Sequence, residues 1–146
     1  MTTPTFSLRL CDWDTARREA ARIREQVFVR EQGVPAEIEM DAQDAQCEHA
    51  LAYGADGTAL GTGRLLPDGH VGRMAVLKQW RGRGVGALLL QALVDRARVR
   101  GDAVVRLNAQ TAAAGFYRHY GFEVSGPEFV EAGIAHVPMQ RRLKPG

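Results

Sequence analysis

The sequence predicts one mixed α/β domain, in which helices flank a central mixed, mostly antiparallel sheet. In the first half, short runs of alternating apolar and polar residues are joined by turn residues, which is typical of antiparallel hairpins. The second half contains a strand–helix–strand unit, whose apolar residues keep helical spacing in its helix. The length of 146 residues, with 45% hydrophobic and 25% charged residues, fits a single globular domain over 1–146.

The N-terminal segment predicts a strand followed by a long helix. Residues 5–10 alternate apolar and polar side chains, as a strand with one buried face does. Asp14 or Thr15 can cap a helix that runs to about Gln32, and Gly33 is its expected stop.

The middle of the chain predicts a hairpin and one further strand. Residues 36–47 are polar and acidic and show no clear period. Strands at 49–53 and 60–66 are joined by the turn residues 55–57, and the next strand covers 70–77.

The C-terminal half predicts a helix that opens at a glycine-rich loop, residues 81–86, and ends at Gly101. The remaining elements are a strand at 103–107, a helix capped by Thr111 and ended by Gly121, and strands at 122–124 and 134–142.

Composition argues against several classes of protein. The net charge of +2 is too small to indicate nucleic-acid binding, and no apolar run approaches the roughly 20 residues that span a bilayer. The N-terminus lacks the basic and apolar segments of a secretory signal, so a cytoplasmic location away from membranes is expected. Cys47 and His49 are spaced like half of a metal site, but no second pair has ligand spacing, and no metal is predicted.

The charged residues are unevenly distributed. Basic residues crowd the segment 73–83, and acidic residues crowd the segment 31–48. Opposite poles suit a protein that binds an anionic cofactor and a cationic substrate, although two solvated faces would give the same pattern.

The glycine-rich loop predicts an anion site. Glycines can adopt backbone angles closed to other residues and let a ligand approach the main chain. The loop opens a helix, whose free N–H groups and dipole favour an anion, and Arg81 and Arg83 add positive charge. The spacing fits neither a P-loop, which needs a Lys-Ser/Thr pair after the last glycine, nor a dinucleotide fingerprint. A phosphate or pyrophosphate is the expected ligand, and a tight turn beside a solvated basic patch is the alternative.

Two motifs resemble signatures of the GNAT acetyltransferase superfamily. Arg81-Gly82-Arg83-Gly84-Val85-Gly86 is similar to its R/Q-x-x-G-x-G/A motif, and residues 113–122, AAGFYRHYGF, resemble its A-x-x-F-Y-x-x-x-G-F motif. The two lie one helix and one strand apart, as in that family, and the chain also resembles its small bacterial YjcF-like members. The resemblance implies the GNAT fold and transfer of an acetyl group from acetyl-CoA to a primary amine.

The resemblance also implies where acetyl-CoA binds. The strand at 71–77 would splay from the strand at 103–108, and the pantetheine arm would enter the gap. Backbone groups of the first strand would bind that arm and the developing oxyanion, and loop N–H groups would hold the pyrophosphate. Gln110 stands where many relatives carry an asparagine that contacts the cofactor. The implied cofactor residues are Met74, Ala75, Val76, Arg81, Gly82, Arg83, Gly84, Val85, Gly86, Ala87 and Gln110.

Acetyl transfer needs an acid for the leaving thiolate and a route for the proton of the amine. Tyr117 matches the tyrosine that protonates the thiolate in the family, and its alternative role is packing in the core. His70 matches a position that supplies a base in some relatives, and Glu39 is the second candidate for the base. A solvated histidine beside a turn is the alternative for His70.

The acidic segment offers an acceptor site. Glu31, Asp41 and Asp44 could receive a cationic amine, or they could lie in a solvated loop or an Asx turn. The acceptor can be a small-molecule amine or a protein amine, and a homodimer is left open.

A second resemblance, to acyl-homoserine-lactone synthases, rests on spaced residues of the N-terminal half. These residues are Arg24, Phe28, Glu39, Asp41, Asp44 and Arg64. The chain is short for such a synthase, and Val34 stands at the position of the synthases' tryptophan, so this function is a minor alternative. A non-catalytic module that binds CoA as a sensor is the other alternative.

Overall fold

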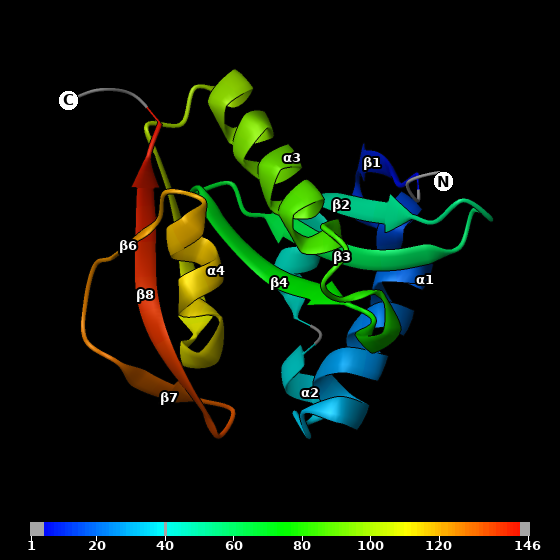
Figure 1. The fold of residues 1–146 in the computed structure, drawn as a ribbon, viewed down its shortest axis with the longest axis horizontal. Coiled ribbons are helices and arrows are strands. Elements are labelled where there is room, and N and C mark those ends of the chain that lie inside the picture. The colour runs from blue at the N-terminus through cyan, green and yellow to red at the C-terminus, as the bar shows by residue number, and fades with distance from the viewer. Residues whose placement is uncertain (1–4, 40, 144–146) are drawn as a thin grey trace.

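A computed structural model describes residues 5–39 and 41–143, and it contains an eight-stranded sheet flanked by helices (Figure 1). The strands are β1 (Ser7–Cys11), β2 (Glu48–Tyr53), β3 (Ala59–Leu65), β4 (His70–Val76), β5 (Val104–Gln110), β6 (Glu123–Val124), β7 (Phe129–Glu131) and β8 (Ile134–Arg142). They are ordered β1-β2-β3-β4-β5-β8-β6, and β7 pairs with β8. Only the β4–β5 pair is parallel among the described strands, so the predicted mixed, mostly antiparallel sheet is confirmed.

The first helix starts earlier than the sequence predicts. Asp12 caps α1 (Trp13–Arg24), because its carboxylate accepts a hydrogen bond from the Thr15 N–H at 2.9 Å. Neither Asp14 nor Thr15 is therefore the cap. After Arg24 the helix widens into a π-helical segment, Glu25–Glu31, and Gly33 follows with a φ of +75°.

The acidic segment without a clear period forms two short helical pieces. They are α2 (Ala36–Glu39) and a 3₁₀ turn over Ala42–Gln46. Asp41 caps the 3₁₀ turn by accepting a hydrogen bond from the Gln43 N–H at 3.1 Å. The cap leaves the second carboxylate oxygen of Asp41 available for other partners.

Alternation along β2 places its two faces against different helices. Ala50 and Ala52 pack toward α3 (Val85–Arg100), whereas Leu51 packs against Ala16 and Ala20 of α1. The two helices therefore cover opposite faces of the first half of the sheet (Figure 1). The small alanines let the helices approach the sheet closely, and the buried side chains of α3 fill the larger cluster.

The two halves of the sheet separate between β4 and β5. These strands pair only at His70↔Arg106 and Val71↔Leu107, and beyond this point they diverge. β5 instead pairs along its whole length with β8. The splay implied by the family resemblance is therefore present, and Figure 1 shows the gap between β4 and the β5–β8 half.

The C-terminal elements differ in detail from the prediction. Thr111 begins a 3₁₀ turn, Thr111–Ala113, and α4 (Ala114–His119) follows without a side-chain cap, so Thr111 does not cap the helix. The strand β7 was not predicted. It pairs with β8 through a two-residue turn in which Ala132 and Gly133 both have positive φ, as a type I′ hairpin requires. Within the described residues, none of the helices is long and apolar enough to cross a membrane.

Candidate active site

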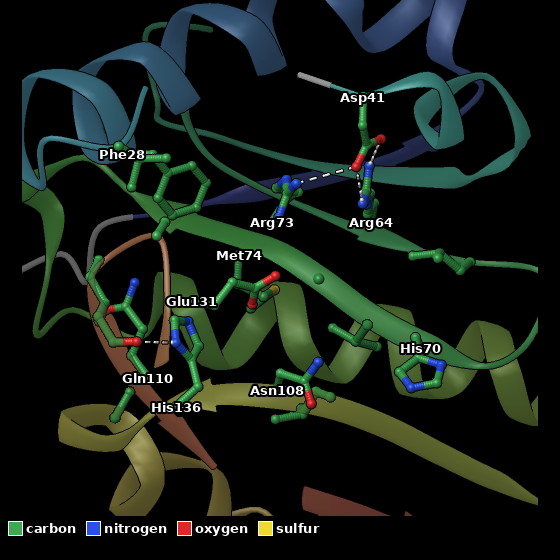
Figure 2. A pocket seen from close by; sticks show the side chains of 18 of the residues that line it. Phe28, Asp41, Arg64, His70, Arg73, Met74, Asn108, Gln110, Glu131 and His136 are labelled. Carbon is green, nitrogen blue, oxygen red and sulfur yellow. Dashed lines mark hydrogen bonds and ion pairs between the residues drawn. The ribbon is translucent and has the colours of Figure 1, made fainter. Parts of the chain in front are cut away.

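A cavity of about 510 Å³ opens where β4 and β5 diverge (Figure 2). Its walls come from the end of β3 and the turn after it, the two diverging strands, the π-helical segment, α4 and the β7–β8 hairpin. Asp41 and Gln43, after α2, complete the rim. Residues far apart in the sequence thus meet around one space, which lies where the pairing of β4 with β5 stops.

A bulge in β4 shapes one wall of this cavity. Thr62 pairs with Ala75 and Arg64 with Gly72, so Gly63 faces both Arg73 and Met74. Arg73 has a φ of +50°, the left-handed angle that turns the strand out of the ladder. A side chain at Gly63 would meet Met74 Sδ at 2.5 Å and Leu93 Cδ1 at 2.9 Å, so the glycine makes room for Met74.

Of the three β4 residues implied in cofactor binding, the bulge brings one to the cavity. Met74 lines it, Ala75 is buried against the α1 side of the sheet, and Val76 packs at the edge of the main core. A bulge bends the strand locally, and here it places Met74 at the cavity.

Tyr117 projects from α4 into the cavity wall. Its ring makes edge contacts with Phe116 and Phe122 at centroid distances of 5.1 and 6.0 Å. Burial raises the pKa of Tyr117 to about 12, because desolvation disfavours the phenolate. The hydroxyl therefore stays protonated at neutral pH and can donate a proton.

The glycine-rich loop has the geometry that an anion needs. Gly82 and Gly84 have φ of +76° and +88°, and no atom lies within 4 Å of a Cβ built on either. Gly84 is the N-cap of α3 without a side-chain cap, and the first helical bond runs from the Leu88 N–H to its carbonyl. The N–H groups of residues 85–87 therefore precede the hydrogen-bonded part of the helix, and they fit a phosphate.

Arg81 is engaged by the protein itself. Its guanidinium donates two hydrogen bonds to Glu31, at 2.6 and 2.8 Å, and a third to the Val76 carbonyl at 2.9 Å. The hydrogen bond from Arg81 holds the pKa of Glu31 below its usual value. Glu31, expected at the acceptor site, thus ties the π-helical segment to the start of the loop and does not line the cavity. The second loop arginine, Arg83, stacks over the Trp80 ring at 5.0 Å.

The other two acidic candidates belong to a network of ion pairs. Asp44 is 1% exposed and contacts Arg24 at 2.9 Å and Arg64 at 2.8 Å. Asp41 contacts Arg64 at 2.8 Å and Arg73 at 3.2 Å, and Figure 2 shows these contacts at the cavity rim. The network joins α1 to the β4 bulge through side chains that also carry the synthase resemblance.

Hydrogen bonds set the charge state of this network. The hydrogen bond from Arg64 is the main cause of the lowered pKa of Asp41. Burial acts to raise the pKa of Asp44, but the hydrogen bonds and charges of Arg24 and Arg64 outweigh it, and the pKa is lowered. Both carboxylates are therefore ionised at neutral pH and are already paired with cations.

The remaining predicted site residues differ in their position relative to the cavity. Gln110 lines the cavity and donates a hydrogen bond to the Gln32 side chain at 2.9 Å. His70 lies where β4 and β5 still pair, with its Nδ1 3.0 Å from Asp68 Oδ1. Glu39 is the last residue of α2, and its side chain lies outside the described part of the structure.

Sequence reasoning missed several residues that the cavity brings together. Glu131 and His136 enter it from the β7–β8 hairpin, and Asn108 enters it from β5 (Figure 2). The Ala-Gly turn between two short apolar runs was the available signal for the hairpin. Within the described residues, no cluster of three or more His, Cys, Asp and Glu is arranged to hold a metal.

The family is decided by comparison with known proteins. The model of the acetyltransferase (GNAT) domain matches residues 13–143. The chain belongs to the GNAT acetyltransferase family. It is 41% identical to the uncharacterized N-acetyltransferase YjcF of Bacillus subtilis, over 85% of this chain and 91% of that protein. It is also 37% identical to the uncharacterized YyaT of the same organism, over 86% and 88%.

Solved structures of similar proteins share this fold over nearly the whole chain. A Pseudomonas aeruginosa acyl-CoA N-acyltransferase is 28% identical, with a TM-score of 0.83 over 94% of this chain and 99% of that one. A candidate N-acetyltransferase of Lactobacillus plantarum is 32% identical, with a TM-score of 0.86 over 96% and 99%. This GNAT protein is accordingly an N-acetyltransferase, with its cavity at the splayed strands.

Proposed function

We propose that this GNAT protein transfers an acetyl group from acetyl-CoA to a primary amine bound in the cavity. The observation that carries the proposal is the combination of three features in this fold. They are the glycine loop at the start of α3, the β4 bulge and the protonated hydroxyl of Tyr117.

Each feature has one role in the reaction. Loop N–H groups of residues 85–87 bind the pyrophosphate, and the pantetheine arm lies between β4 and β5. Backbone N–H groups at the bulge, near Met74, donate to the acetyl oxygen as it becomes negative. As the C–S bond breaks, Tyr117 gives its proton to the departing thiolate and regains one from the acylated nitrogen.

The paired charges around the cavity favour a cationic or neutral acceptor over an anionic one. Asp41 and Glu131 are carboxylates of the cavity lining, and the contacts of Arg64 and Arg73 with Asp41 offset much of their positive charge. An ammonium group therefore meets the negative charge of Glu131 on this wall.

The test is thiol release from acetyl-CoA with a panel of amines, followed by mass spectrometry of each product. The panel contains butylamine, spermidine, glucosamine, lysine and a peptide with a free N-terminus. We expect a mass increase of one acetyl group on at least one amine, with stoichiometric thiol. Tight binding of CoA without acetylation of any amine would favour the sensor alternative and overturn the proposal.

A further inference from the structure

One face of the β7–β8 hairpin lies against the cavity. Phe129 pairs with His136 and Glu131 pairs with Ile134, so these side chains lie on the same face of the hairpin. Glu131, Ile134 and His136 line the cavity, and Figure 2 shows the first and last of them directed into it. Gln110, the β5 partner of His136, lines it as well.

The ring of His136 is held in one orientation and one tautomer. Its Nδ1 lies 2.7 Å from the Ile134 carbonyl oxygen, which can only accept a hydrogen bond. Nδ1 therefore carries the proton of the neutral ring, and Nε2 keeps its lone pair. The Phe129 ring stacks on the imidazole, with centroids 5.7 Å apart and planes 21° apart, which fixes the ring plane.

We propose that His136 is the general base of this transfer and that Glu131 stabilises the acceptor's positive charge beside it. The inference rests on the proposed function. Nε2 takes one proton from the acceptor ammonium, and the nitrogen lone pair then forms the C–N bond to the acetyl carbon. The C–S bond breaks, Tyr117 protonates the thiolate, and the second proton of the nitrogen restores Tyr117. The proton on His136 leaves to solvent, so the net products are the amide, CoA thiol and one proton.

Position distinguishes His136 from the other candidates for the base. His70 lies at the closed end of the gap, where β4 and β5 are still paired, although it also lines the cavity. Asp41 is held by Arg64 and Arg73, which lower its basicity. His136 pairs with the last residue of β5, at the open end of the gap, on the wall opposite the β4 bulge.

The test compares His136→Asn with the parent. The asparagine amide can still donate to the Ile134 carbonyl, as Nδ1 does, but it has no counterpart of Nε2. His119→Gln is the matched control, since His119 is exposed on α4 and is not in the cavity lining. The charged and titratable groups that share the cavity are Asp41, Arg64, Asp68, His70, Arg73, Tyr117 and Glu131, and all are unchanged in both variants.

Rates are measured against pH with each amine of the panel that the parent acetylates. We expect His136→Asn to lower kcat/KM about 10²-fold at pH 7, with acetyl-CoA affinity unchanged. The deficit should shrink as pH approaches about 10, because the free amine then needs no base. If the loss in kcat/KM is the same at every pH, or if there is no loss, His136 is not the general base.

A second measurement does not depend on turnover. Long-range ¹H–¹⁵N NMR of the labelled protein with coenzyme A should show His136 protonated on Nδ1 and unprotonated on Nε2 at pH 8. The opposite tautomer would overturn the role of His136 as the base but would not contradict the proposed acetyl transfer. If the parent acetylates no amine of the panel, the proposed function is overturned, and the proposed base is overturned with it.

Discussion

Tyr117 combines a polar end with an aromatic ring that is fixed by its neighbours. Tyr117→Phe removes the hydroxyl and keeps the contacts with Phe116 and Phe122. We expect kcat to fall about 10²-fold, the low end for an acid, because a thiolate of pKa near 8.5 can partly leave unprotonated. Stopped-flow or steady-state kinetics measure the fall, and calorimetry should give the parent's affinity for acetyl-CoA. A phenylalanine variant with the parent's kcat would limit Tyr117 to packing.

Asp44, unlike Tyr117, contributes to the stability of the fold and takes no part in the reaction. Asp44→Asn removes a buried carboxylate that contacts both Arg24 and Arg64, so we expect a loss of about 3–5 kcal/mol in the free energy of unfolding. Urea unfolding at pH 7 measures the loss. The control is Asp95→Asn, which breaks an exposed pair with Arg98 and should cost about 0–1 kcal/mol. Equal losses in the two variants would contradict the buried network.

The pH dependence of stability follows from the same carboxylates. The folded-state pKa values of Asp41 and Asp44 are lowered, so their contribution is present above the unfolded value of about 3.9 and is lost as pH falls through the folded values. Parent and Asp44→Asn should therefore converge in stability as the pH falls below about 4.

At the scale of elements, the β4 bulge depends on a glycine in the neighbouring strand. Gly63→Ala would place a methyl group 2.5 Å from Met74 Sδ and 2.9 Å from Leu93 Cδ1. We expect a loss of about 1–3 kcal/mol on overpacking and weaker acetyl-CoA binding, because Met74 must move at the cavity wall. Thermal unfolding and calorimetry measure the two effects.

Gly115→Ala is the matched control for the bulge. No atom lies within 4 Å of a Cβ built at Gly115, so the alanine should leave stability unchanged or raise it slightly. Parent-like stability and affinity in Gly63→Ala would mean that β4 adjusts freely and that the bulge does not depend on this glycine.

Local signals explain which elements could be predicted from the sequence. The strands at 49–53 and 70–77 and the helix from the glycine loop to Gly101 have strong periodicity and punctuation, and all are present. The Asp12 cap was missed because the sequence offers three polar candidates within four residues, and only the hydrogen bond to the Thr15 N–H distinguishes them. The bulge at Arg73 was missed because a non-glycine residue gives no local sign of positive φ.

The candidate site was less predictable because its walls depend on pairing over long distances. The Glu31–Arg81 pair joins residues 50 positions apart, and a basic residue beside a glycine loop looks free until its partner is placed. The position of His136 in the cavity follows from the register in which β8 pairs with β5 and β7. β7 has only three residues, so its sequence does not indicate this register.

At the scale of the whole molecule, the protein consists of two sheet halves held by few bonds at the gap. The β4–β5 pairing has two residue pairs, so a ligand that fills the gap touches both halves. Binding to the folded state alone stabilises it by RT ln(1 + [L]/Kd), about 2.7 kcal/mol at 100-fold Kd. CoA should therefore raise Tm by several degrees, and free pantetheine at the same concentration should raise it less, because only CoA carries the phosphates for the loop.

A pair of loop variants tests whether that difference comes from the α3 N-terminus. Gly84 has a φ of +88°, which both asparagine and aspartate tolerate, and nothing lies within 4 Å of a Cβ there. The two side chains have nearly equal size and capping ability and differ in charge. Gly84→Asn should keep most of the Tm increase produced by CoA over pantetheine, whereas Gly84→Asp should lose it, because a carboxylate at the free N–H groups repels the pyrophosphate. Scanning calorimetry with both ligands measures the four increases. Equal increases in the two variants would show that the phosphates bind elsewhere on the protein.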